Sequence, residues 1–343
     1  MTNSPNQSKK KDEIFDTTII GAGPVGLFGA FYAGLRGMKV KIVDSLDEPG
    51  GQLVALYPEK FIYDMPGFPE IYAKDLAHQM IIQANRFHPT YALGEQCQTL
   101  ERHKDIWVLA TNKAEHLSKT VIICAGVGSF TPTKLGIEHE DEFVNKGLSY
   151  GVKNKEAMRN QRCVIVGGGD SAVDWALNLQ GVASEITLIH RNDRFRAHEH
   201  SVRQLLATPT NVRLWEVVTE LFGDGYLKAV KVKNTKTHAE TTIPCDRLIV
   251  CIGFKTTLGP LKHWNLTLEK NKIVVDQRMQ TNLEGVFAAG DICTHEGKLD
   301  LIATGVGEVC VAVNFAKKYI DPHVSVFPGH STDMTLPPLE KKT

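Results

Sequence analysis

The segment Phe15–Asp44, FDTTIIGAGPVGLFGAFYAGLRGMKVKIVD, decides the fold of this chain. It opens with the β-branched run FDTTII, which predicts a buried strand, and passes directly into the glycine turn GAGPVG at residues 21–26. Apolar residues at helical spacing follow in LFGAFYAGLRG, and MKVKIVD predicts a second strand. That strand ends at Asp44, 18 residues after Gly26. The order strand, glycine turn, helix, strand, acid predicts a dinucleotide site.

Each part of this segment has a physical role in binding a dinucleotide. The first glycine closes the turn, the second lets the backbone approach a pyrophosphate, and the third lets the helix pack against the strand. Free N–H groups at the start of the helix attract phosphates, and the acid accepts hydrogen bonds from a ribose with a free 2′-hydroxyl group. The predicted contacts are Gly21, Gly23, Pro24, Gly26 and Asp44.

The same order of elements recurs in the second half of the chain. RCVIV predicts a strand, and the turn GGGDSA at residues 167–172 and a helical segment follow it. The next strand, EITLIHR, ends in arginines instead of an acid, and guanidinium groups pair bidentately with a 2′-phosphate. This site is therefore predicted to bind NADPH, with a solvated loop as the alternative for the arginines. The predicted contacts are Gly167, Gly169, Asp170, Ser171, Ala172, His190, Arg191 and Arg196.

The composition is that of a globular protein of 343 residues. Since a single core stops growing at roughly 250–300 residues, we expect two domains. The 39 basic and 39 acidic side chains give a formal charge of zero, which argues against a nucleic-acid-binding protein. Seven cysteines without a CxxC pair exclude a zinc ribbon and a local redox disulfide, and they favour a reducing, cytoplasmic environment.

Two segments invite a targeting interpretation. Residues 1–13 are polar and no apolar core follows them, so they predict a disordered leader instead of a signal peptide. Residues 18–35 are apolar but contain Pro24 and five glycines, which a strand and a glycine turn explain better than a membrane span. We therefore expect no membrane insertion.

Four segments carry a family resemblance. TNLEGVFAAGD at 281–291 resembles the second FAD motif of the two-dinucleotide flavoprotein disulfide reductases, and GGQL at 50–53, DMPG at 64–67 and HRNDRFR at 190–196 resemble thioredoxin reductase. The resemblance runs from about residue 14 to residue 319. It implies an α/β fold of two Rossmann-like dinucleotide-binding domains. Each domain has three layers, in the order ββα, and the NADPH domain is inserted into the FAD domain.

The domain boundaries follow from two apolar strands that each end in a glycine, TVIICAG and RLIVCIG. Paired strands of this kind are expected at the links between domains. We expect the first part of the FAD domain at residues 1–129, the NADPH domain at 130–256 and the second part of the FAD domain at 257–343.

One departure from thioredoxin reductase changes the expected activity. That family carries a CxxC pair just before the second glycine turn, and here the corresponding positions are Tyr150-Gly151-Val152-Lys153. Without a thiol pair, the chain has no nucleophile that could pass electrons to a disulfide. A second departure is the extension DPHVSVFPGHSTDM after residue 320. Together they resemble the thioredoxin-reductase-like ferredoxin or flavodoxin–NADP⁺ reductases, which are homodimers with one non-covalent FAD per subunit.

This resemblance implies hydride transfer between NADPH and FAD, followed by one-electron transfer to or from ferredoxin or flavodoxin. It also implies that Tyr57 stacks on one face of the flavin and that His330 covers the other. Without the resemblance, both would read as ordinary surface or core residues. The further FAD contacts that it implies are Gly51, Gln52, Cys97, Phe130, Gly290, Asp291 and Thr332.

Two other functions fit parts of the sequence. A reductase of low-molecular-weight disulfides, of the bacillithiol type, would need a cysteine near the flavin, and Cys97 is the candidate. A redox sensor that binds FAD without turnover would not need the NADPH-binding features. The run His198-Glu199-His200 does not predict a metal site, because on a helix residues two apart point away from each other.

Overall fold

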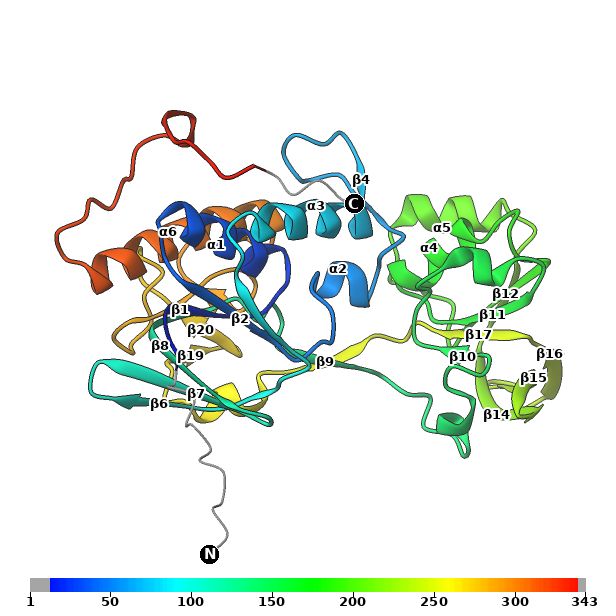
Figure 1. Cartoon of the computed structure of the whole chain (residues 1–343). Helices are drawn as coiled ribbons and strands as arrows, with labels where there is room; N and C mark the ends of the chain where they lie inside the picture. Colours follow the sequence, from blue (N-terminus) through cyan, green and yellow to red (C-terminus); the bar gives the residue numbers. More distant parts are fainter. Residues whose placement is uncertain (1–12, 339–343) are drawn as a thin grey trace, which may run out of the picture. The chain divides into compact units, whose positions relative to one another are not determined.

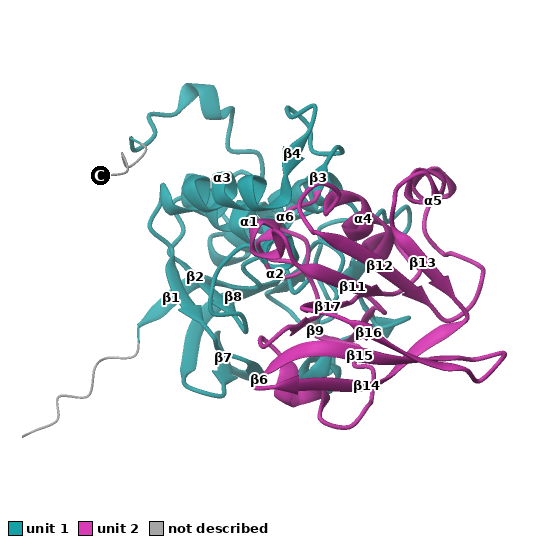
Figure 2. Ribbon diagram, turned by 90° about the vertical axis from the view of Figure 1, so that its right-hand side faces the viewer, with its two compact units in different colours: residues 1–54, 61–129, 257–343 teal, residues 55–60, 130–256 magenta. Residues whose placement is uncertain are grey.

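The computed structural model describes residues 13–338, which form two compact units (Figure 2). Unit 1 comprises the chain up to residue 54, residues 61–129 and the chain from 257 onward, and unit 2 comprises residues 55–60 and 130–256. The paired strands β9 (Ser129–Pro132) and β18 (Phe254–Thr257) carry the chain between the units. The predicted leader lies largely outside the described residues.

Unit 1 contains a seven-stranded sheet in the order β5-β2-β1-β8-β7-β6, with β21 also paired to β8 (Figure 1). Strands β5, β2, β1, β8 and β21 pair in parallel, and β6, β7 and β8 form an antiparallel meander. The strand bounds are β1 Ile14–Ile20, β2 Val40–Asp44, β5 Thr90–Leu93, β6 Cys97–His103, β7 Ile106–Thr111, β8 Glu115–Ile123 and β21 Val286–Ala288.

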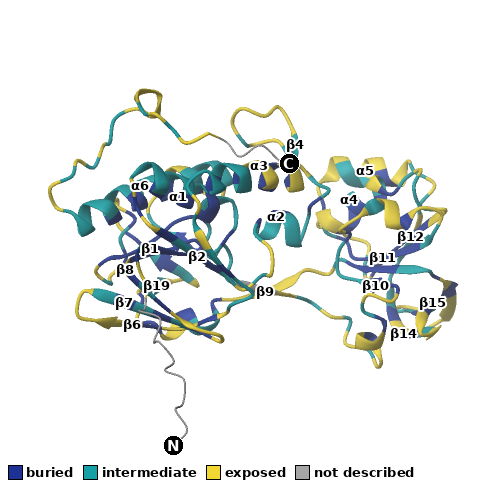
Figure 3. Cartoon of the chain, viewed as in Figure 1, coloured by how far each residue is buried: buried dark blue, intermediate teal, exposed yellow. Residues whose placement is uncertain are grey.

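Three helices cover this sheet: α1 (Pro24–Leu35), α3 (Ala73–Asn85) and α6 (Ile302–Ile320). Helix α1 contacts both of the others. It approaches α6 closely at Gly29, where a Cβ atom would lie 2.7 Å from Cγ2 of Val309. Phe15, Ile19 and Phe287 from the sheet are almost fully buried, so the core lies between strands and helices (Figure 3).

The smaller elements of unit 1 lie at the edges of this core. A short helix, α2 (Gln52–Ala55), precedes the hairpin of β3 (Phe61–Ile62) and β4 (Ile71–Tyr72). A three-stranded sheet is formed by β19 (Leu268–Glu269), β20 (Lys272–Val274) and β22 (Cys293–Thr294). No helix within residues 13–338 is both long enough and apolar enough to cross a bilayer.

Unit 2 contains a five-stranded parallel sheet in the order β10-β17-β11-β12-β13 and a three-stranded antiparallel sheet in the order β14-β15-β16. Its helices are α4 (Asp170–Asn178) and α5 (Glu199–Leu206). The strand bounds are β10 Leu148–Ser149, β11 Arg162–Val166, β12 Glu185–His190, β13 Asn211–Leu214, β14 Glu216–Asp224, β15 Tyr226–Asn234, β16 Glu240–Pro244 and β17 Arg247–Val250.

Strand β11 shows how the layers of unit 2 form. Successive side chains of a strand point to opposite faces of the sheet. Val164 and Val166 accordingly join the core that includes Val230 of the antiparallel sheet, whereas Ile165 joins the core that includes Trp175 of α4. The predicted α/β fold with two dinucleotide-binding units is confirmed, and unit 2 has the predicted ββα layers.

The structure assigns two segments, residues 55–60 and the C-terminal extension, to particular units. Residues 55–60, which the sequence places in the first part of the FAD domain, group with unit 2, where Nζ of Lys60 lies 2.6 Å from Oδ2 of Asp174. The C-terminal extension belongs to unit 1. Arg36, at the end of α1, donates to the carbonyl oxygen of Ser325 at 2.7 Å, and Arg86, after α3, donates to that of Pro337 at 2.5 Å.

The positions of the missing CxxC pair are part of the framework of unit 2. The Tyr150 hydroxyl donates to Oε1 of Glu140 at 2.9 Å, and the backbone N–H groups of Leu135 and Gly136 donate to the same carboxylate at 2.9 Å each. Glu140 is buried, and Val152 is 1% exposed. Burial and the hydrogen bond to Glu140 raise the pKa of Tyr150 well above its usual range. At the position where the resemblance expects the first thiol of a CxxC pair, this chain forms a tyrosine–carboxylate contact.

Replacing Tyr150 by Phe removes one of the donors to the buried Glu140 carboxylate. We expect the free energy of unfolding of unit 2 to fall by about 1 kcal/mol, which is typical for one lost hydrogen bond. Urea unfolding, together with hydrogen exchange of peptides covering residues 135–150, measures the loss. Tyr226→Phe is the control, because Tyr226 is 64% exposed. Equal unfolding midpoints for the two variants would contradict the assignment.

Candidate functional site

The first glycine turn joins β1 to α1 in unit 1. Gly21 has a φ of +108°, and a Cβ atom there would lie 2.3 Å from the carbonyl oxygen of Cys124. A Cβ atom on Gly26 would lie 1.9 Å from the carbonyl oxygen of Gly21. Gly23 caps α1 without a side-chain hydrogen bond, so the first N–H groups of the helix are left for a ligand. This turn has the shape and the donors that a pyrophosphate requires.

Asp44 lies beside this turn, as its sequence position predicts. Its Oδ2 accepts from the Ala22 N–H at 2.5 Å, and its Oδ1 accepts from the Leu46 N–H at 2.8 Å. Burial raises the pKa of Asp44, although these backbone donors favour its ionised form. A carboxylate has about four lone-pair sites, so Asp44 can accept two more hydrogen bonds from a ribose.

A second loop meets the turn at Gly50 and Gly51. The Gly50 N–H donates to the carbonyl oxygen of Ala22 at 2.8 Å. Gly51 has a φ of +57°, and a Cβ atom there would lie 2.7 Å from Cα of Gly23. The side chain of Gln52 lies beside Gly126, at the end of β8, since a Cβ atom on that glycine would be 3.1 Å from Nε2 of Gln52. Side chains on these glycines would fill the cradle.

The Gly290–Asp291 turn, which follows β21, completes this face of unit 1. Gly290 has a φ of +81° and packs against Val25 of α1. A Cβ atom on Gly305, in α6, would lie 2.6 Å from Cγ2 of Val25 and 3.2 Å from Cα of Gly290. Asp291 is partly buried, and burial raises its pKa. The structure thus brings the predicted residues Gly23, Gly51 and Gly290 around the start of α1.

Sequence reasoning missed the residues that hold Gly290 in place. Oε2 of Glu308, on α6, accepts from the Gly290 N–H at 2.8 Å, and Lys298 donates to both oxygens of the same carboxylate at 2.7 and 2.8 Å. The sequence feature that could have indicated this role is the acid Glu308 on the buried face of α6, between the buried residues Gly305 and Val309.

Cys97 is buried at the start of β6, and its thiol is poorly suited to disulfide exchange. Burial raises the pKa of Cys97 to about 12, and the charge of Asp44 acts in the same direction. Disulfide exchange requires a thiolate. The other six cysteines are also free thiols whose pKa is raised, mainly by burial. None of the seven is an activated nucleophile.

The second glycine turn, in unit 2, repeats the geometry of the first. A Cβ atom on Gly167 would lie 2.3 Å from the carbonyl oxygen of Cys251 and 2.9 Å from Cβ of Ala172. Gly169 caps α4 without a side-chain hydrogen bond, which leaves N–H groups for a phosphate. Asp170 and Ser171, in the first turn of α4, are exposed.

The loop after β12 folds back onto this turn, and His190 is its buried anchor. The His190 ring is 8% exposed, packs against Gly168 and stacks on Phe195 at 5.0 Å between ring centroids. The Arg196 N–H donates to the carbonyl oxygen of Gly168 at 2.7 Å, and the His198 N–H donates to Oδ1 of Asp170 at 2.8 Å. His190 and Asp170 therefore position the loop.

Three arginines of this loop are exposed: Arg191, Arg194 and Arg196. Within the described chain, no ion pair is recorded for their guanidinium groups, so they are available to an anion bound at the turn. The backbone of the loop is held beside the second glycine turn, because the N–H groups of Arg196 and Ala197 both donate to the carbonyl oxygen of Gly168.

The remaining predicted flavin contacts belong to other segments of the chain. Tyr57 lies in the segment of residues 55–60 that groups with unit 2. His330 and Thr332 are exposed in the C-terminal extension, where the His330 ring meets Phe327 edge-on at 5.4 Å. Among the residues that the structure describes, no recorded contact joins His330 or Thr332 to the turn at residues 21–26. The side chain of Phe130 lies outside the description. The roles of these residues stay predictions.

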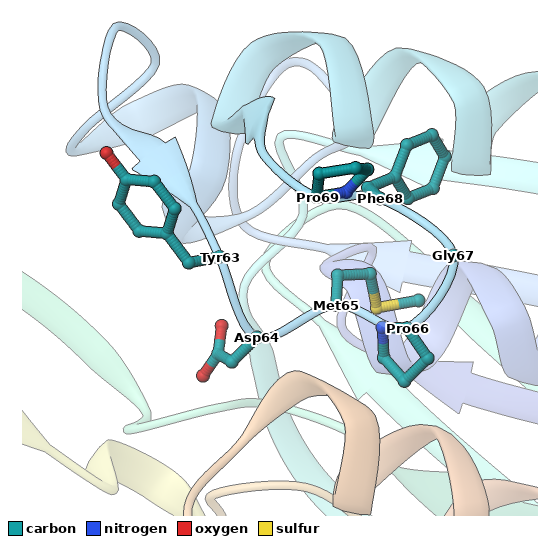
Figure 4. A pocket seen from close by; sticks show the side chains of 7 residues that line it. All are labelled: Tyr63, Asp64, Met65, Pro66, Gly67, Phe68 and Pro69. Carbon is teal, nitrogen blue, oxygen red and sulfur yellow. The ribbon is translucent and has the colours of Figure 1, made fainter.

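The segment DMPG lies in the exposed loop between β3 and β4. Residues 63–69 of this loop surround a hollow of about 550 Å³, and Figure 4 shows their side chains just before the start of α3. Tyr63 is 68% exposed. Only residues 63–69 line this hollow, and neither glycine turn contributes a residue to it.

Comparison with known proteins places this geometry in context. The model of the family "Pyridine nucleotide-disulphide oxidoreductase" matches residues 15–313. The chain is 49% identical to ferredoxin–NADP reductase of Halalkalibacterium halodurans, over 95% of this chain and 99% of that protein. It is 48% identical to ferredoxin–NADP reductase 2 of Bacillus subtilis, over 95% and 98% of the two chains. Among solved structures, thioredoxin reductase of Lactococcus lactis matches with a TM-score of 0.72 and 29% identity, over 89% and 99%.

The raised pKa of Cys97 predicts slow alkylation of its thiol. At pH 7 we expect iodoacetamide to modify Cys97 about a thousandfold more slowly in the native protein than after unfolding, because the thiolate fraction falls with rising pKa. The native rate should increase about tenfold per pH unit from pH 7 to pH 10, whereas an ordinary thiol levels off above its pKa of about 8.5. Mass spectrometry of the peptide containing residue 97 measures both rates, and a native plateau below pH 8 would show that the thiolate is accessible.

Proposed function

The chain belongs to the pyridine nucleotide-disulphide oxidoreductase family, and we propose that within this family it is a ferredoxin–NADP⁺ reductase, with FAD bound on unit 1 and NADPH on unit 2. The observation that carries the proposal is the presence of a dinucleotide-binding turn in each unit of a chain that has no CxxC pair and whose seven thiols have a pKa raised mainly by burial. The chain has two turns that can each bind a redox dinucleotide, and the raised pKa values of its thiols disfavour the thiolate that a disulfide reductase needs.

The residues of unit 1 fit a non-covalent FAD. The turn at residues 21–26 and the start of α1 receive the pyrophosphate, and Asp44 receives the adenosine ribose. Gln52 and Asp291 flank the same cradle and receive the flavin end of the cofactor. The proposed FAD domain keeps the predicted bounds 1–129 and 257–343, apart from residues 55–60, which group with unit 2, and each subunit holds one FAD.

The residues of unit 2 fit NADPH. The turn at residues 167–172 and the start of α4 receive its pyrophosphate, and Arg191 and Arg196 receive its 2′-phosphate. Arg194 is a third exposed arginine on the same loop. The NADPH domain comprises residues 130–256. The contrast between Asp44 on unit 1 and the arginines on unit 2 assigns the two cofactors to their sites.

When bound, the cofactors would supply the redox chemistry, which is hydride transfer from NADPH to FAD and single-electron transfer to ferredoxin or flavodoxin. The chain's own residues bind the two cofactors, orient them and exclude water. In this proposal, Tyr57 and His330 cover the two faces of the flavin, the active form is a homodimer, and the enzyme acts in the cytoplasm.

Reduction of a low-molecular-weight disulfide is the alternative activity. It requires a thiolate near the flavin, and the raised pKa of Cys97 argues against it. A redox sensor without turnover is disfavoured as well, because the exposed arginines beside the second turn have no role in binding FAD alone.

The proposal predicts the spectrum and the electron acceptor of the purified protein. It should be yellow, and NADPH should bleach it much faster than NADH. Cytochrome c should be reduced only when ferredoxin or flavodoxin is added as the intermediate carrier. Stopped-flow absorbance and a coupled cytochrome c assay measure these properties, and reduction of a thiol–disulfide substrate at a comparable rate would overturn the assignment.

A second prediction concerns the choice of nucleotide. Replacing both Arg191 and Arg196 by Ala should lower kcat/KM for NADPH by about 10- to 100-fold, the range expected for lost hydrogen bonds to a charged group. The kcat/KM for NADH should stay within about twofold, because NADH has no 2′-phosphate for the arginines to bind. Steady-state kinetics with both nucleotides measure this difference, and an equal loss for both would favour a solvated loop.

A further inference from the structure

A buried ion pair lies beside the proposed flavin site and has no part in the proposed reaction. Lys298, in the loop after β22, donates to both carboxylate oxygens of Glu308 on α6. The two side chains are only 7% and 9% exposed. Nε2 of His295 lies 3.1 Å from Oε1 of Glu308, and Sγ of Cys293 lies 3.7 Å from Oε2.

Such a pair is costly to bury. Two charges lose their hydration in the interior, and their mutual attraction compensates only when the remaining hydrogen-bonding positions are also satisfied. Here the Glu308 carboxylate meets donors on both oxygens, and the last of these is the backbone N–H of Gly290 at 2.8 Å. Buried ion pairs are weak contributors to stability, so the contact with Gly290 points to a role in geometry.

The hydrogen bond from the Gly290 N–H to Glu308 fixes the main chain next to Asp291, which is a residue of the proposed cofactor site. Gly290 immediately precedes Asp291, and it packs against Val25 and Gly305 at the starts of α1 and α6. Glu308 therefore fixes one turn against the two helices that border the cradle. A shift of Gly290 would move Asp291 relative to the first glycine turn.

The charges around Asp291 also require Lys298. Two acids, Asp300 and Glu308, oppose the ionisation of Asp291, and two lysines, Lys298 and Lys272, favour it. Lys272 pairs with Asp300, with Nζ 2.6 Å from Oδ1. Each acid is thus matched by a lysine, and removal of Lys298 would leave Asp291 close to an uncompensated negative charge.

We propose that the Lys298–Glu308 pair is a positioning element for FAD: it holds the Gly290–Asp291 turn in the geometry that binds the cofactor and balances the charge beside Asp291. Neither residue touches the reacting atoms. The inference rests on the proposed function in that FAD is the ligand of unit 1.

The test uses Lys298→Met and Glu308→Gln in the full-length chain. Lys298→Met leaves a buried carboxylate without its cation, and Glu308→Gln keeps an oxygen for the Gly290 N–H but leaves Lys298 unpaired. We expect FAD to bind at least about tenfold more weakly to each variant, because a buried charged partner is left unsatisfied near the turn. Fluorescence titration of the apoprotein with FAD measures the dissociation constants.

A second readout separates positioning from a general structural role. The thermal midpoint of each variant is measured with and without saturating FAD. Positioning predicts that the rise in the midpoint caused by FAD becomes smaller in the variants, because ligand stabilisation follows affinity. A pair that is merely structural would lower both midpoints equally and leave the rise unchanged, which would overturn the proposal.

The double variant Lys298→Met/Glu308→Gln carries neither charge of this pair, so it keeps the test decisive if one single variant does not fold. Charge compensation predicts that the double variant binds FAD more weakly than the wild-type chain but more tightly than Lys298→Met. Binding equal to that of the wild-type chain would overturn the proposal. The matched control is Glu284→Gln, the same substitution in the exposed ion pair with Arg102 of unit 1, and it should leave FAD binding unchanged.

The two proposals can fail separately. If the wild-type apoprotein does not bind FAD, the proposed function itself is wrong. If the wild-type holoenzyme reduces ferredoxin, but both single variants bind FAD within twofold of the wild-type affinity, the proposed function stands and the positioning role is wrong.

Discussion

The structure depends on the close approach of a strand end to a neighbouring carbonyl group at the first glycine of the glycine turn in each unit. In unit 1 a Cβ atom on Gly21 would lie 2.3 Å from the carbonyl oxygen of Cys124, and in unit 2 a Cβ atom on Gly167 would lie 2.3 Å from that of Cys251. The backbone hydrogen bonds at this point are also the same in both units. The Cys124 N–H donates to the carbonyl oxygen of Ile20, and the Cys251 N–H donates to that of Val166, both at 2.7 Å. Any residue with a side chain would separate the strands at this point, so glycine here is a condition of the fold.

This constraint explains why the sequence predicted so much of the fold. The requirement for glycine is local, and the strand, turn and helix that it joins lie within about thirty residues of one another, as is usual for a βαβ unit. Asp44 was predicted for the same reason, because its distance from Gly26 along the chain is set by one helix and one strand. The position of the cradle loop at Gly51 followed from the family resemblance, and its contact with Gly23 supplies the physical reason.

The residues that sequence reasoning missed depend on contacts that are distant in sequence. Glu308 binds a main-chain N–H 18 residues away, and only its place on the buried face of α6, beside Val309, could have indicated that it serves an internal partner. His190 stays a predicted NADPH contact, and the structure adds that its buried ring packs against Phe195 of the arginine loop. The placement of the C-terminal extension rests on hydrogen bonds from Arg36 and Arg86, which no local pattern encodes.

The two units show how one scaffold acquires different chemistry at positions that the fold does not constrain. The glycines and the buried strands are nearly interchangeable between the units, whereas the end of the second strand carries Asp44 in one unit and exposed arginines in the other. The positions that the resemblance assigns to a CxxC pair, Tyr150 and Lys153, also carry side chains that the fold does not prescribe. Tyr150 there forms a hydrogen bond to Glu140, which preserves the local structure while removing the group that could relay electrons to a disulfide. Because a fold does not determine a function, the acceptor of the electrons must be argued from such side chains. In this chain these side chains support the proposal that electrons depart from a bound flavin instead of a thiol pair.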